Sequence, residues 1–127
     1  MQRTISIRIE TTPEQDSILS QTLMGCCNCF NKVAGYGWEN RIWNGVTLHK
    51  ATYYDLREEH PELPSQLVIS SRMKATEAVK SAFALLKKGR KVGVPRTERG
   101  SVRYDARTYR MEVEKGIVGL STVEGRI

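Results

Sequence analysis

Residues 65–91, SQLVISSRMKATEAVKSAFALLKKGRK, carry the pattern that decides the fold. Apolar or small side chains recur there at three- and four-residue spacing, which is typical of a helix with one buried face. That face carries Val68, Ser71, Ala75, Val79, Ala82, Phe83 and Leu86. Ser65 is a suitable helix cap, Gly89 a suitable end, and lysines in the last turn complement the helix dipole. The pattern therefore predicts a helix over residues 65–89.

Upstream of this stretch, the spacing predicts a longer helix over about residues 13–36. Thr12 and Gln15 form a capping box around Pro13, which fits the first helical turn. Gly35 and Gly37 are expected to end the helix. The stripe of apolar and small residues comprises Leu19, Leu23, Cys26, Cys27, Phe30, Val33 and Ala34.

Between these two helices, the sequence predicts a loop followed by a shorter helix. Residues 38–46 hold two tryptophans and several polar side chains, and we expect a loop there. Thr47 is a candidate cap for a helix that reaches about Glu59. Pro61 and Pro64 then break the chain.

Both ends of the chain have the two-residue alternation of β-strands. In residues 2–10, Arg3, Ile5, Ile7 and Ile9 face one way, which predicts a strand with one buried face. After Gly89, Val92 and Val94 alternate, and short β-like runs follow at 102–104, 109–113, 117–120 and 123–127. An isolated first strand needs partners, and only the C-terminal runs can supply them. We expect an α+β fold in which about three helices are inserted into a small partial β-barrel that stops in mid-pattern.

Charge is distributed unevenly along the 127 residues, whose net charge is +6. Residues 1–86 hold nine basic and nine acidic groups, whereas residues 87–127 hold eleven basic and five acidic groups. The whole excess thus lies in the last third, which favours a polyanionic partner. No apolar run of about 18 residues and no secretory leader is visible, so we expect a cytoplasmic setting.

The three cysteines, Cys26, Cys27 and Cys29, lie close together on the first predicted helix. Their odd number and the lack of a second Cys/His cluster argue against a zinc site. We interpret them as small buried side chains of a core helix, and we expect no metal or cofactor.

The basic run from Lys87 to Arg96 is the strongest chemical signal in the sequence. Arginine and lysine at this density neutralise phosphates, and Tyr104 and Tyr109 could stack on unpaired bases. The third predicted helix adds polar side chains suited to base edges in a major groove, including Ser71. A generic basic surface and an ordinary solvated helix face remain the alternatives.

No catalytic set is recognisable in the sequence. His49 and His60 are isolated, and no phosphate-binding loop motif occurs. The acidic cluster Asp55, Glu58, Glu59 and Glu62 could bind Mg²⁺, although a solvated helix face is the simpler interpretation. We therefore expect that the chain alone is not an enzyme.

Several short motifs occur in an order that resembles a known family. They are RTISIRIETTPEQ at the start, CCNCFNKV, TYYDLREEHPELP, AVKSAF with KKGRKVGVPR and SVRY, and KGIVGLSTVEGRI at the end. Together they resemble the N-terminal region of TnpB (OrfB) proteins of insertion sequences, which are RNA-guided DNA endonucleases related to type V CRISPR effectors. Val94 and Thr97 stand where that family usually has aromatic residues.

The resemblance implies a division into a first wedge strand (1–10), an inserted helical recognition domain (11–89) and further wedge strands (90–127), cut off before a RuvC-like nuclease domain that would hold the catalytic carboxylates. It also implies two partners, a guide RNA and a duplex DNA next to the target. The residues expected at RNA or phosphate are Lys87, Lys88, Arg90, Lys91, Arg96, Arg99, Arg103, Tyr104 and Arg107. Those expected at duplex DNA are Tyr53, Ser65, Gln66, Ile69, Ser70, Arg72 and Lys74.

Three functions remain open from the sequence. The first is the nucleic-acid-binding front part of a TnpB-like nuclease, with the missing half or a second copy as a further partner. The second is a stand-alone DNA-binding regulator derived from such a protein. The third is an unrelated interaction module whose basic tail is incidental.

Overall fold

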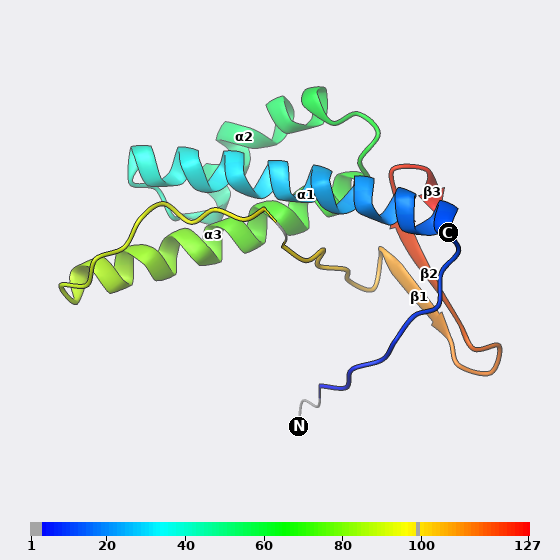
Figure 1. Ribbon diagram of the computed structural model, residues 1–127. Helices are drawn as coiled ribbons and strands as arrows, with labels where there is room; N and C mark the ends of the chain where they lie inside the picture. Colours follow the sequence, from blue (N-terminus) through cyan, green and yellow to red (C-terminus); the bar gives the residue numbers. More distant parts are fainter. Residues whose placement is uncertain (1–3, 99) are drawn as a thin grey trace.

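The computed structural model describes residues 4–98 and 100–127, and these form a mixed α+β structure (Figure 1). Helices α1 (Pro13–Asn40), α2 (Gly45–Glu59) and α3 (Ser65–Lys87) come first. Strands β1 (Tyr109–Glu112), β2 (Ile117–Thr122) and β3 (Gly125–Arg126) follow and form an antiparallel sheet in that order. The α+β class and the three helices agree with the sequence prediction. No helix in the described part of the chain is long and apolar enough to cross a membrane.

Helix α1 begins as predicted and ends later than predicted. The side chains of Thr12 and Gln15 form the expected capping box. The helix passes through Gly35 and Gly37, ends at Asn40 and is capped by Arg41, whose φ of 54° is left-handed. A Cβ on Gly37 would lie 2.7 Å from the carbonyl oxygen of Ile42. This glycine therefore permits a close return of the chain and does not stop the helix.

The caps of α2 and α3 differ from the prediction. The side chain of Asn44 accepts hydrogen bonds from the backbone of Val46 and Thr47, so α2 begins earlier than a Thr47 cap would allow. Pro64 occupies the N-cap position of α3, which has no side-chain cap, and Ser65 is already helical. At the other end, Gly89 has a φ of 79° and follows the last turn, as predicted.

The three helices share one core. Cys29, Val33, Leu48, Leu56, Leu67, Val68 and Val79 are completely buried. All three cysteines are free and buried, which confirms their interpretation as core side chains. Burial raises the pKa of the Cys29 thiol to about 12 because it disfavours the thiolate.

The sheet is short and open, with β1 and β3 at its edges. Tyr109 pairs with Leu120 and Glu112 with Ile117 across the β1–β2 turn, where Gly116 has a φ of 65°. These strands and the return to β3 lie where the sequence predicted them. The runs at 92–94 and 102–104 are irregular, because this segment is attached to the helices and does not form a ladder.

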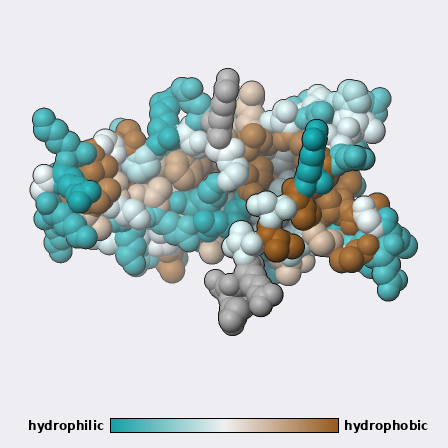
Figure 2. Space-filling model, turned by 60° about the horizontal axis from the view of Figure 1, so that its bottom comes forward, coloured by the Kyte–Doolittle hydropathy of each residue, from teal (hydrophilic) through white to brown (hydrophobic). Residues whose placement is uncertain are grey.

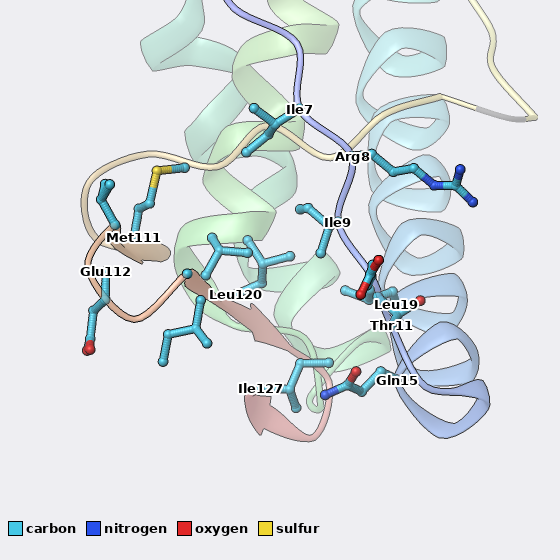
Figure 3. Close-up of a pocket in the computed structure, with 15 residues that line it drawn as sticks. Ile7, Arg8, Ile9, Thr11, Gln15, Leu19, Met111, Glu112, Leu120 and Ile127 are labelled. Atoms are coloured by element: carbon cyan, nitrogen blue, oxygen red, sulfur yellow. The ribbon is translucent and has the colours of Figure 1, made fainter.

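The predicted first strand is wrong for residues 4–10, and residues 1–3 lie outside the described part. Residues 4–10 form no strand ladder. They nevertheless lie beside the sheet, and Ile7 and Ile9 line a pocket of about 640 Å³ with Met111 and Leu120 (Figure 3). Arg8 and Glu10 line the same pocket, so the alternation does not separate a buried face from a solvent face. The segment lies beside the sheet without backbone pairing (Figure 1).

Candidate nucleic-acid interface

An irregular segment, residues 88–98 and 100–108, leaves the end of α3 and returns along the helices (Figure 1). The side-chain amide of Asn31 both donates to and accepts from the backbone of Thr97, each at 2.8 Å. The ammonium group of Lys74 donates to the Ser101 carbonyl at 2.7 Å. These contacts attach the segment to α1 at Thr97 and to α3 at Ser101.

Six cations at the end of α3 and along this segment are exposed. They are Lys87, Lys88, Arg90, Lys91, Arg96 and Arg107. Among the described residues, none of the six forms an ion pair with a carboxylate. Their charges are therefore not compensated within the described protein and are available to phosphate groups. A seventh predicted residue, Arg99, lies outside the described residues.

Arg103 and Tyr104 have partners within the protein. Arg103 donates to Glu77 through its two terminal guanidinium nitrogens, at 2.7 and 3.2 Å, and this lowers the pKa of the Glu77 carboxyl. The Tyr104 hydroxyl donates to the Ser121 carbonyl at 3.0 Å, and its half-buried ring packs on the core. Burial raises the pKa of Tyr104 to about 12. Tyr104 is accounted for by packing, and we leave it out of the interface.

Six of the seven residues predicted to contact duplex DNA lie on α3, where they occupy more than one face. Ser65, Ile69 and Arg72 follow one another at four- and three-residue spacing and share a side of the helix. Ser70 is buried, and Lys74, one turn further on the same side, binds Ser101. Of the others, Gln66 is half-buried, and Tyr53 on α2 stacks on His49 with ring centroids 4.5 Å apart. The structure does not bring all seven together.

Sequence reasoning missed a groove of about 840 Å³ between α2 and α3. Arg72 lies in it with Trp43, His49, Lys50 and Lys80, four residues that the sequence did not assign to a site. Arg72 and Lys80 are eight residues apart, which is a helical repeat visible in the sequence. The residues from α2 could not be matched to them without knowing how the helices pack.

The acidic residues near the end of α2 do not form a metal site. Glu59 binds Lys32, and the Glu62 carboxylate lies 3.9 Å from the imidazole of His60. Within residues 4–98 and 100–127, no group of three or more potential ligands is placed to hold a metal ion. This cluster offers no evident chemistry.

Comparisons of the chain with protein-family models, with curated proteins and with solved structures found no match.

Proposed function

We propose that this chain is a nucleic-acid-binding module whose main contact surface is the basic segment, defined here as Lys87, Lys88, Arg90, Lys91 and Arg96. The observation that carries the proposal is that these five cations are exposed and have no carboxylate partner in the described structure. Phosphate backbones attract such a surface by releasing bound counterions, and this requires no particular base sequence.

The way the segment is attached supports this function. Directly beyond the basic segment, Asn31 holds the backbone of Thr97 and Lys74 holds that of Ser101. Holding the chain just after Arg96 reduces the conformational entropy that this end of the segment would lose on binding.

The finer proposal is that the chain corresponds to the N-terminal wedge and recognition region of a TnpB-like RNA-guided nuclease. Three helices lie between an N-terminal extended segment and a C-terminal sheet, and that segment lines a pocket together with the sheet. This arrangement is compatible with a partial barrel interrupted by helices. In that case the basic segment binds structured guide RNA, and the catalytic carboxylates belong to a separate RuvC-like domain.

A binding titration tests the proposal. The purified chain is titrated with a structured RNA, a duplex DNA and a single-stranded DNA, each at two salt concentrations. We expect binding that weakens steeply with salt, and structured RNA should bind most tightly.

The variant for this test carries Lys87→Gln, Lys88→Gln, Arg90→Gln and Lys91→Gln, and it should bind RNA much more weakly. A matched control removes four positive charges elsewhere, through Arg8→Gln, Lys32→Gln, Arg41→Gln and Lys115→Gln, and its affinity should fall by less. Preference for duplex DNA over RNA would favour a DNA-binding regulator instead. A lack of binding to all three ligands at low salt would refute the proposal.

A further inference from the structure

The groove between α2 and α3 contains two buried nitrogen atoms that have no hydrogen-bond partner among the described residues. Arg72 Nε and His49 Nδ1 are inaccessible to solvent and make no hydrogen bond to any described residue. A buried donor that lacks a partner is costly and calls for an explanation. Burial also lowers the pKa of Arg72, because it disfavours the charged guanidinium.

The charge of the groove is strongly positive. Lys50 and Lys80 line it together with Arg72, and Glu77 is the one carboxylate among its lining residues in the described structure. Arg103 holds that carboxylate through two hydrogen bonds from outside the lining. The remaining cations therefore face the groove without an opposing charge.

The Arg72 guanidinium lies close to the backbone at the start of α2. A Cβ on Gly45, the first residue of α2, would lie 2.8 Å from Arg72 Nη1, which is too close for an ordinary contact. Glycine at this position lets the helix terminus approach Arg72. The position of the guanidinium thus depends on a neighbouring residue as well as on its own side chain.

We propose that this groove binds one phosphate group of a nucleic-acid backbone, with Arg72 as the central ligand and Lys50 and Lys80 as flanking charges. The inference rests on the proposed nucleic-acid-binding function and adds a second contact on a different pair of elements from the basic segment. Arginine suits phosphate because its planar fork can donate two parallel hydrogen bonds. A bound phosphate would also compensate the charge of Arg72, which pairs with no carboxylate in the described structure.

Nuclear magnetic resonance of the labelled chain tests the groove directly. Trp43 lines the groove and is 46% exposed, so its indole N–H signal reports on a bound ligand. The chain is titrated separately with a short duplex DNA and with inorganic phosphate. We expect the signals of Trp43 and His49 to shift with both ligands, and with DNA at much lower concentration.

Two variants separate the position of the guanidinium from its charge. Arg72→Gln removes the charge and should weaken duplex binding roughly tenfold or more. Gly45→Ala keeps every charge but pushes the guanidinium away, and should weaken binding in the same direction. Gly35→Ala is the matched control, because a Cβ there meets nothing within 4 Å.

The outcomes distinguish this inference from the proposed function. If DNA binds but the groove signals do not shift, and Arg72→Gln binds as tightly as the wild type, the groove is not a phosphate site and the proposed function stands. If inorganic phosphate shifts the signals and DNA does not, the groove binds a small phosphate compound. Its assignment to a nucleic-acid backbone is then overturned. If neither ligand shifts them, the inference is refuted.

Discussion

The helical half of the molecule and the half made by the sheet and the N-terminal segment bury their apolar residues very differently. Leu67 in α3 is completely buried, whereas Ile117 in β2 is 55% exposed and Val113 beside it is 80% exposed. Figure 2 shows hydrophobic side chains gathered on the surface where the sheet and the N-terminal segment lie. The comparison indicates that the helices supply the stability, while the sheet keeps an apolar face that the described chain does not cover.

The largest expected effect is on a core leucine. Leu67→Ala should lower the free energy of unfolding by ~2–5 kcal/mol, because it leaves a cavity between the helices. Ile117→Ala should lower it by less than ~1 kcal/mol, since most of that side chain is already in water. Urea unfolding followed by circular dichroism measures both. Equal losses would contradict the division into two unequal halves.

A smaller effect is expected where the irregular segment that follows α3 is attached to α1. Asn31→Ala removes both hydrogen bonds to Thr97 and should destabilise the chain by ~1–2 kcal/mol. Hydrogen exchange of the Thr97 amide should become much faster, because that amide donates to Asn31. Asn28→Ala on the exposed side of the same helix is the control and should leave this amide unchanged. Unchanged exchange in the Asn31 variant would show that the segment is held by other contacts.

The thiols provide a local probe of the helical core. Because Cys29 is fully buried and its pKa is raised to about 12, it should react with iodoacetamide at pH 8 far more slowly than a cysteine in the unfolded chain. Mass spectrometry of the peptide that carries Cys29 measures the rate with and without urea. Rapid alkylation under native conditions would mean that α1 opens readily.

The smallest effect is expected for the ion pair between Arg103 and Glu77. Glu77→Gln should cost only ~0–1 kcal/mol near neutral pH, since both side chains are largely exposed. The pKa of Glu77 is lowered in the folded chain, so the ion pair stabilises the fold above the ordinary carboxyl pKa and loses this effect as the pH falls through the lowered value. The difference in stability between wild type and variant should therefore vanish in acid. A difference that grows in acid would refute this assignment.

The sequence correctly predicts the elements that have strong local signals. The prediction fails where tertiary contacts determine the structure. The capping box of Thr12 and the buried cysteines are confirmed because both follow from local spacing. The prediction of a helix end at Gly37 is wrong, because the close approach that requires a glycine there comes from Ile42 beyond the helix.

The N-terminal strand was predicted from alternation alone, which cannot show whether a backbone partner is in register. For the candidate site, the basic segment is visible in the sequence as a charge excess. The groove around Arg72 is not, because it depends on how α2 packs against α3.

The salt dependence of RNA binding tests the central claim most directly. The logarithm of the binding constant is measured against the logarithm of salt concentration for the wild type, for the variant with four substitutions at 87–91, and for its charge-matched control. We predict a steep slope for the wild type that becomes shallower by roughly 0.7–0.9 for each phosphate that the variant no longer neutralises, and by less in the control. A slope that is the same for the variant and the wild type would contradict the assignment of the basic segment as the nucleic-acid surface.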